Sequence, residues 1–356
     1  MIHEKLLSVA DVARWQATLP ATASIFGSVE YARIYQEHTG HAARLFVLSS
    51  DTGAVAFPFF LRPVNSLPFA VNLDREWVDI LSPEYTGPIA RTTDQALMQS
   101  FREQFDVVCR QHNIIAEFAH LHPWNWQAEC LYSEDVSLDR EIVYVDVTLS
   151  EGQLWNESLT YACRKNLNRT RQENVRVFVA TSLDHVREFY RIYTHTMDRN
   201  NALKRYYFPF DYFQAFFEQM PDHVHFVLAE YRDQIVAATL YLHDDVDVYS
   251  YLGGADQAFQ QIRPTNAVVY DTINWARQHG KRRLILGGGY HPDDGIFRFK
   301  SSFSPLRARF QVYKHVHQAE EYAQICSAWL AYYHGCELAP NYFPAYRSIP
   351  PADTES

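Results

Sequence analysis

The chain lacks both the cysteine pattern of a secreted protein and the long apolar run of a membrane protein. It has five cysteines in 356 residues, no two of them form a C-x-x-C pair, and the odd number leaves one unpaired. Free thiols in a reducing compartment are therefore expected. No apolar run approaches about 20 residues, and Met1 to Ala10 has no basic-then-apolar signal pattern. These absences predict a cytoplasmic protein with no transmembrane segment.

The common enzyme motifs are missing as well. The chain has no H-E-x-x-H, no G-x-S-x-G, no G-x-x-x-x-G-K-[ST] and no G-x-G-x-x-G. The absences exclude typical zinc peptidases, α/β-hydrolases and enzymes with a glycine-rich phosphate loop. Three H-x-H pairs have strand spacing, but none has cysteines or carboxylates at zinc-site intervals, so we expect no metal site. These pairs are His120/His122, His223/His225 and His315/His317.

Charge and composition describe an acidic globular protein. The formal net charge is −10, which argues against a protein that coats nucleic acid but leaves room for a local basic groove. Hydrophobic residues make up 47% of the chain, so a sizeable core is available. The length allows one large domain or two of ordinary size.

The two halves of the sequence predict the same order of secondary-structure elements, which indicates an internal repeat. Residues 43–48 and 53–61 flank a polar turn and predict a β-hairpin, as do residues 225–230 and 234–242 in the second half. Each half then continues with an apolar-periodic helix that ends in Arg-Gln-His, at 110–112 and at 277–279, followed by a strand. We predict a mixed α/β (α+β) fold of two tandem domains, each a twisted mixed sheet flanked by helices. Their ranges are 1–150 and 151–335, followed by an irregular tail at 336–356.

A basic segment lies between the two halves. Cys163 and Leu167 fall at helical spacing, so residues 164–171 are predicted to form a short helix with its arginines exposed, before a strand at 175–179. Such a charged run is either a solvated face or a binding surface for anions, and the residues leave both interpretations open.

The stretch from Lys281 to Lys300 carries the strongest local signal. A short apolar run flanked by basic residues predicts a buried strand that ends at Gly287-Gly288-Gly289. Phe297, Arg298, Phe299 and Lys300 alternate, and in an extended segment they would place two rings on one face and two cations on the other. This pattern indicates fixed positive charge aimed at an anionic ligand.

The combined pattern resembles the Fem family of peptidoglycan-bridge aminoacyltransferases, which are built from two tandem GNAT-like domains. Roughly residues 25 to 315 are similar to the family, and the G-x-x-F-K-x-x-F-like motif is the most specific part of the match. The segments that carry the resemblance are Tyr85-Thr86-Gly87-Pro88, Arg164-Lys165-Asn166-Leu167-Asn168-Arg169, Tyr249 to Ala255, Arg263-Pro264-Thr265-Asn266 and Gly295 to Phe303.

The resemblance implies acyl or aminoacyl transfer onto an amine, with roles for particular residues. Lys300 would hold an anionic reactant or stabilise a developing oxyanion, and Tyr251 would donate a proton to the leaving group. The implied substrate-binding residues are Phe299, Arg298, Tyr249, Arg199, Tyr206, Tyr85 and His122. The implied donor-binding residues are Arg164, Lys165, Arg169 and Asn266.

The donor and the acceptor stay open at this point. No tightly bound cofactor is expected, and the co-substrate is aminoacyl-tRNA, bound through local basic patches, or acyl-CoA. Both glycines of the usual CoA-binding loop are replaced at 261–267, which favours the tRNA. The acceptor is a small-molecule, lipid-linked or nucleotide-linked amine of a cell-envelope, sugar or peptide pathway. His122 stands where the peptidoglycan enzymes have an acidic residue, so the acceptor need not be a cell-wall precursor. An inactive anion-binding module is the rival interpretation, and the oligomeric state is not predicted.

Overall fold

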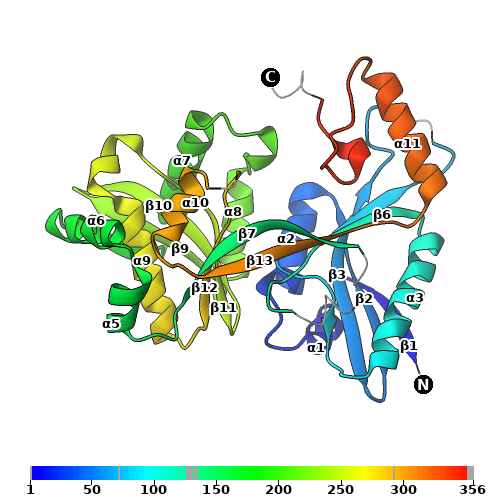
Figure 1. The fold of residues 1–356 in the computed structure, drawn as a ribbon, viewed down its shortest axis with the longest axis horizontal. Helices are drawn as coiled ribbons and strands as arrows, with labels where there is room; N and C mark the ends of the chain where they lie inside the picture. The colour runs from blue at the N-terminus through cyan, green and yellow to red at the C-terminus, as the bar shows by residue number, and fades with distance from the viewer. Residues whose placement is uncertain (1, 71–72, 126–130, 132–134, 292, 351–356) are drawn as a thin grey trace. The chain divides into compact units, whose positions relative to one another are not determined.

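A computed structural model describes the whole chain except residues 1, 71–72, 126–130, 132–134, 292 and 351–356. The described residues form two compact units (Figure 1). Their strands belong to one continuous mixed sheet, and the part of it in each unit is called the sheet of that unit. The first unit consists of Met1–Asp139 together with Phe310–Ser356, and the second unit is Arg140–Arg309.

The first unit is built on a mixed sheet. Strands β1 and β2, β2 and β3, and β3 and β4 pair antiparallel, β4 and β6 pair in parallel, and β6 pairs antiparallel with β13. The strands are β1 (His3–Ser8), β2 (Ala42–Ser50), β3 (Gly53–Pro63), β4 (Val78–Leu81), β6 (Ile114–His120) and β13 (Arg307–Val316), and the short β5 (Ile89–Ala90) pairs with β3. The main helices are α1 (Val12–Thr18), α2 (Val29–Thr39), α3 (Gln95–Gln111) and α11 (Ala319–Tyr332).

The second unit repeats this topology strand for strand. Strands β8 to β11 pair antiparallel in succession, β11 and β12 pair in parallel, and β12 pairs antiparallel with β7. The strands are β8 (Arg176–Val179), β9 (Val224–Tyr231), β10 (Gln234–His243), β11 (Asp247–Ala255), β12 (Arg283–Gly287) and β7 (Val136–Asp146). The helices are α5 (Glu151–Gln153), α6 (Tyr161–Gln172), α7 (Leu183–Arg199), α8 (Phe210–Gln219), α9 (Pro264–Gln278) and α10 (Gly295–Ser301). The predicted internal repeat and the mixed α/β fold class are confirmed.

The last strand of each sheet is exchanged between the two halves of the sequence. Strand β7 follows β6 along the chain, yet residues 143–146 pair with β12 of the second unit. Strand β13 follows β12 and α10, yet residues 312–316 pair with β6 of the first unit. Each sheet is therefore completed by a segment that comes after the core of the other unit.

The exchange changes the domain boundaries from those predicted. The chain passes into the second unit after Asp139 rather than near 150, and it returns to the first unit at Phe310 rather than continuing to 335. The described part of the C-terminal segment, predicted as an irregular tail, is anchored to the first unit. Tyr346 is fully buried, and Asp79 of β4 accepts hydrogen bonds from Tyr346 Oη at 3.0 Å and from Arg347 Nε at 2.5 Å.

The sheet of the second unit is covered on both faces because successive side chains of β9 point to opposite sides. Phe226 packs against Phe189 of α7 with ring centroids 4.9 Å apart, whereas Val227 belongs to the core under α6 and α9. Figure 1 shows α9 running along this sheet beside α6. Helices α7 and α9 both contact β11, and α9 also contacts β12, which fixes the strands that form the candidate site.

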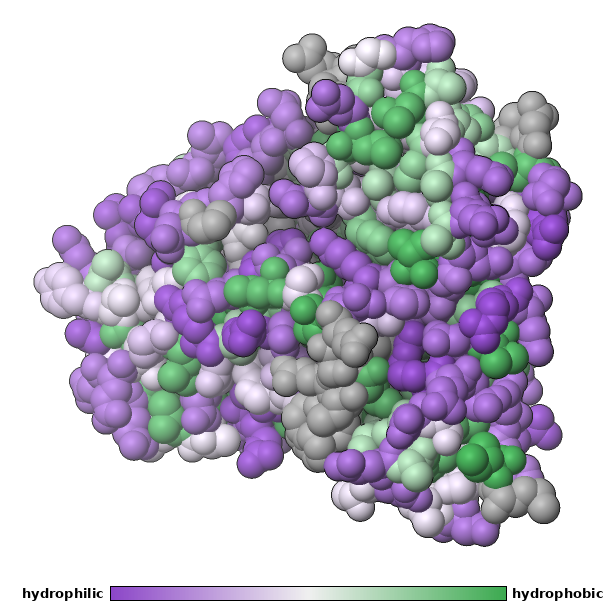
Figure 2. All heavy atoms as spheres, turned by 45° about the vertical axis from the view of Figure 1, so that its right-hand side comes forward, coloured by the Kyte–Doolittle hydropathy of each residue, from purple (hydrophilic) through white to green (hydrophobic). Residues whose placement is uncertain are grey.

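Hydrophilic side chains cover most of the face drawn in Figure 2, with apolar ones interspersed among them. Among the described residues, no helix has both the length and the apolar character needed to span a bilayer.

Candidate functional site

Strands β11 and β12 of the second unit begin side by side and then separate. Their parallel pairing joins Asp247 to Arg283, Val248 to Leu284 and Tyr249 to Ile285. Strand β11 then continues to Ala255 while still paired with β10 on its other edge. Beyond Tyr249, the β11 edge that faced β12 has no strand partner among the described residues. Backbone N–H and C=O groups on such an open edge are available to polarise or position a bound group.

The two tyrosines predicted on β11 lie at the start of this opening and bind different partners. A register shift between Leu240 and Tyr241 of β10 inserts an extra residue of β11 at Tyr251. Tyr249 is buried, and its hydroxyl donates to the carboxylate of Asp244 at 2.9 Å. The hydroxyl of Tyr251 lies 2.8 Å from that of Tyr212 on α8. Tyr251 is therefore held by a second phenol, and Tyr249 by a buried carboxylate whose pKa burial raises to about 6.

Residues 297–300 form part of the short helix α10, so the predicted extended alternation is wrong. Asp294 ends the preceding loop and accepts a hydrogen bond from Phe297 N at 2.7 Å, which caps the helix. Phe297 and Phe299 still pack against the core of the unit, as predicted for anchors. The local cap overrides the alternating pattern because a helical turn also buries both rings.

Lys300 fixes the glycine loop that follows β12. Its ammonium donates to the carbonyl of Gly288 at 2.6 Å. Asp294 closes the same loop, because it accepts hydrogen bonds from the backbone N–H groups of Tyr290 and His291. A Cβ on Gly289 would lie 2.5 Å from an Asp294 carboxylate oxygen, so a larger residue there would displace the Asp294 side chain from its hydrogen bonds. The ammonium of Lys300 is therefore hydrogen bonded to the glycine loop. Arg298 is exposed, and its guanidinium donates to the backbone carbonyl of Asp293.

Arg199 and Tyr206 reach the same region from α7 and the loop after it. Arg199 donates to Ala255 O, the last residue of β11, at 2.8 Å. Tyr206 contacts the ring of Tyr290 in the loop before α10, with centroids 6.4 Å apart. Both predicted residues therefore border elements that form the candidate site.

A basic groove lies along α6 and reaches the start of α9. It encloses about 790 Å³. Its lining residues are Trp155, Tyr161, Ala162, Arg164, Lys165, Asn166, Asn168, Arg169, Gln172, Glu173 and Arg263. Four of these side chains are cationic and one is anionic. Among the described residues, no ion pair or hydrogen bond engages the side chains of Lys165, Arg169 and Arg263, and the N-terminal end of α9 adds partial positive charge.

The predicted basic helix thus supplies most cations of the groove, but some of its arginines also make contacts within the protein. Arg164 donates to the backbone carbonyls of Trp155 and Leu159, so it also fastens the preceding turn. Arg171 stacks over Trp155, with its guanidinium carbon 4.8 Å from the ring centroid. The sequence interpretation overlooked Trp155, Tyr161 and Arg263. The signal was present, since two aromatics flank the basic helix and an arginine precedes the proline that opens α9.

Asn266 is placed beneath the groove rather than in it. It is buried, and its amide donates to Sγ of Cys163 at 3.7 Å. Burial raises the pKa of the Cys163 thiol to about 11, so the thiol stays neutral beside this amide. The start of α6 is also tied to the end of α10, because Thr160 N donates to Ser302 O at 2.9 Å. Helices α6, α9 and α10 therefore converge around Cys163.

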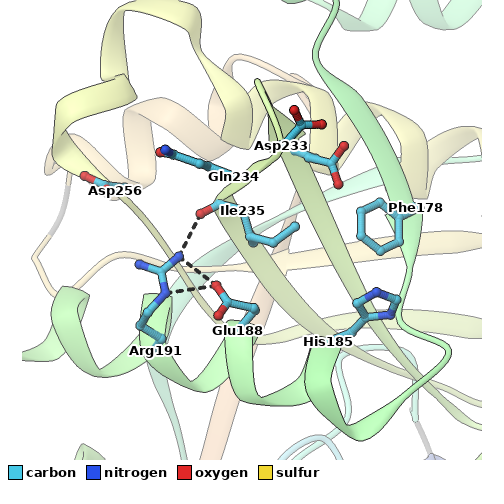
Figure 3. A pocket seen from close by; sticks show the side chains of 9 residues that line it. Phe178, His185, Glu188, Arg191, Asp233, Gln234, Ile235 and Asp256 are labelled. Atoms are coloured by element: carbon cyan, nitrogen blue, oxygen red, sulfur yellow. Dashed lines mark hydrogen bonds and ion pairs between the residues drawn. The ribbon is translucent and has the colours of Figure 1, made fainter.

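A second, smaller pocket of the same unit has the opposite character. It encloses about 440 Å³ beside α7 and the β9–β10 turn (Figure 3). Two of its carboxylates are already paired: Glu188 binds Arg191 at 2.9 Å, and Glu230 binds Arg176 at 2.6 Å. Arg191 also donates to Ile235 O, as the dashed lines of Figure 3 show. Two of its carboxylates are thus neutralised by arginines, so the basic groove is the stronger candidate for a ligand.

The two remaining predicted residues lie in the first unit. Tyr85 is buried against Phe310, and its ring meets that of His122 with centroids 6.5 Å apart. His122 also accepts a hydrogen bond from Trp124 N. The structure brings Tyr85 and His122 together, and their role as substrate contacts stays a prediction.

Comparison with protein families identifies part of the second unit. Residues 158–301 match the acetyltransferase (GNAT) domain family. This segment runs from the turn before α6 to the end of α10, so it contains the open edge of β11, Lys300 and every lining residue of the basic groove except Trp155. No protein of curated function matches the chain.

Solved structures share the fold over nearly the whole chain. FemX superimposes with a TM-score of 0.69 at 10% identity, covering 91% of this chain and 99% of that one. A conserved protein of unknown function from Bacteroides thetaiotaomicron gives 0.57 at 14% identity, with 89% and 100% covered. A tandem GNAT protein from the clavulanic acid biosynthesis pathway gives 0.51 at 8% identity, with 89% and 99% covered. These matches establish the tandem GNAT fold and, at such identities, nothing about substrates.

Proposed function

We propose that the protein transfers an acyl or aminoacyl group from a nucleotide-bearing donor to an amine acceptor, and that aminoacyl-tRNA is the donor. One observation carries the proposal. A basic groove with the exposed aromatic side chain of Tyr161 lies at the start of α9, in the unit whose β11 edge is open. Cations bind phosphates, and aromatic rings stack on bases. The match of residues 158–301 to a GNAT domain supports acyl transfer as the reaction class.

The start of α9 favours binding through side chains over binding through the backbone. Pro264 stands at the first helical position and has no N–H, and Asn266 N donates to Arg263 O. Few backbone donors remain there for a pyrophosphate. Lys165, Arg169 and Arg263 instead offer three cationic side chains along a groove. This arrangement suits a phosphodiester strand better than the compact pyrophosphate of CoA, which is the alternative donor.

The chemistry assigned to the site is direct attack. The acceptor amine forms the new N–C bond at the donor carbonyl, the C–O bond of the ester breaks, and the amine proton passes to the leaving oxygen. Backbone N–H groups on the open edge of β11 would polarise the carbonyl. Tyr251, hydrogen bonded to Tyr212, would relay the proton. Lys300 would hold the Gly288 loop in place and present positive charge beside it.

A binding experiment distinguishes the donors. Affinity for deacylated tRNA and for CoA is measured over a salt series, with wild-type protein and the triple variant Lys165→Gln, Arg169→Gln, Arg263→Gln. For single-stranded nucleic acid each lost phosphate contact lowers the slope of log affinity against log salt by about 0.7, so the triple variant should lower it by about 2. The control is Arg187→Gln with Arg232→Gln, two exposed arginines of the same unit outside the groove, which should leave the slope unchanged.

A transfer assay tests the reaction itself. Charged tRNA, or a panel of acyl-CoAs, is incubated with the protein and cell extract, and acyl consumption is compared with that of Lys300→Ala. Faster consumption of charged tRNA by the wild type supports the proposal. Binding of CoA alone would assign the alternative donor, and binding without transfer would indicate an inactive anion-binding module. Absence of binding to both ligands would contradict the proposal.

A further inference from the structure

The fold of the first unit assembles metal-binding side chains that lie far apart in the sequence. Asp106 lies on α3, whereas His315 lies on β13 and His317 directly follows that strand. One ligand atom from each of the three lies within 4.8 Å of the others. Zinc held tetrahedrally with bonds of about 2.0–2.1 Å places its ligand atoms about 3.4 Å apart. Asp106 and His317 Nδ1 already lie 3.5 Å apart, so the remaining adjustment is the approach of His315, from a spacing of at most 4.8 Å.

Each histidine has its other ring nitrogen held by a separate carboxylate. His315 Nδ1 lies 2.7 Å from Asp135, and His317 Nε2 lies 3.1 Å from Glu117. Metal-binding histidines have this arrangement, because an outer carboxylate fixes the ring and raises the basicity of the nitrogen that binds. The arrangement leaves Nε2 of His315 and Nδ1 of His317 for a common ion. It is a second observation, independent of the clustering, that indicates a metal.

The charges around the cluster also match a divalent cation. Asp106, Glu117 and Asp135 contribute three negative charges, and Arg102, which pairs with Asp106 and Glu117, contributes one positive charge. With neutral imidazoles the sum is −3 + 1 = −2, which one divalent ion neutralises.

We propose that Asp106, His315 and His317 bind a divalent transition-metal ion, with zinc as the fitting member. Two imidazoles and one carboxylate suit zinc and its neighbours rather than magnesium or calcium, which prefer oxygen ligands. The ion would join α3 to the strand that returns from the second unit, and so fasten β13 into the first sheet. Three protein ligands leave the fourth tetrahedral position to a water molecule. The proposed role of the ion is to hold α3 and β13 together, and it takes no part in acyl transfer.

The test measures metal binding by untagged, full-length protein after dialysis against a chelator. Isothermal titration with zinc chloride should give one equivalent bound, a raised melting temperature, and no heat of binding with magnesium chloride. His315→Gln and Asp106→Asn, both on partly exposed side chains, should each weaken zinc binding more than 100-fold. Asp135→Asn, which removes only the outer carboxylate of His315, should weaken it about 10–100-fold. His112→Gln, an exposed histidine of the same unit, is the matched control.

Two results would overturn the proposal. One is failure of the wild type to bind zinc at micromolar concentration. The other is stoichiometric binding that His315→Gln and Asp106→Asn leave unchanged, which would place the ion elsewhere. Circular dichroism of each variant without metal shows whether the fold is retained, so lost binding is not confused with unfolding. If His315→Gln unfolds, Asp135→Asn decides alone, because it leaves all three ligands in place.

Discussion

Replacing His243 with leucine should make the protein less sensitive to acid. His243 ends β10 with both ring nitrogens buried, and neither has a hydrogen-bond partner among the residues that the structure describes. Burial, and then the neighbouring His225 and Lys281, lower its pKa from 6.5 to about 3. The folded state therefore holds this ring neutral, whereas the unfolded chain can protonate it. Its contribution to stability is fully present above about pH 6.5 and is lost as the pH falls towards about 3.

The size of this effect follows from the two pKa values. About pH 5 lies about 1.5 units below the unfolded pKa of 6.5, and one unit is worth 1.36 kcal/mol. Protonation of this ring therefore stabilises the unfolded chain by about 2 kcal/mol at most. Urea unfolding at about pH 8 and about pH 5, followed by circular dichroism, measures it as a double difference. Wild type should lose about 1–2 kcal/mol more than His243→Leu between the two conditions. His112→Gln controls for the loss of one exposed imidazole.

The refuting result is an equal pH dependence of wild type and His243→Leu. The ring would then be solvated or hydrogen bonded in solution, and the buried arrangement with Trp275, whose ring centroid lies 4.9 Å from it, would be wrong. His225, whose pKa burial also lowers, to about 4, is present in both proteins, so its own titration cancels in the double difference.

Three further substitutions test other parts of the structure. Gly254→Ala should destabilise the protein by about 1–3 kcal/mol in urea unfolding, because its Cβ would lie 2.9 Å from Ile192 O of α7; a neutral change would mean that α7 lies further from β11. Asp79→Asn should cost about 3–5 kcal/mol, because it leaves Arg62 and Arg347 without their buried carboxylate, and an unchanged urea midpoint would refute the anchored C-terminal segment. Asp294→Ala should lower the melting temperature through loss of the α10 cap, worth about 1 kcal/mol, whereas an equal melting temperature would contradict the cap.

Local patterns predicted most of the elements of the fold. The two hairpins, α3, α9 and the basic helix α6 all appear where periodicity and turn residues place them. Their signals are local, since an apolar stripe or an alternation needs only its own segment. The pattern failed at residues 297–300, where four residues are too few to distinguish an alternating strand from a capped helical turn.

Features that depend on contacts between distant segments could not be predicted from local sequence patterns. Nothing in the apolar run of β7 or β13 says which sheet it completes, because both sheets offer a similar edge. The same limit applies to the groove, where Arg263 joins Lys165 and Arg169 only through the packing of α9 against α6. It applies to His317 too, whose carboxylate neighbours Asp106 and Glu117 lie about two hundred residues earlier.

The exchange of β7 and β13 limits where the chain can be cut into fragments that fold. A fragment ending at residue 150 would lack β13, so one edge of β6 would be unpaired. It would also carry the 11 residues of β7 without β12, the strand with which β7 pairs. Bare edges and orphan strands invite association with other molecules. Each half should therefore need the other in order to fold. Two co-expressed fragments should assemble into the native structure by pairing β7 and β13 with the other fragment, whereas either fragment alone should aggregate.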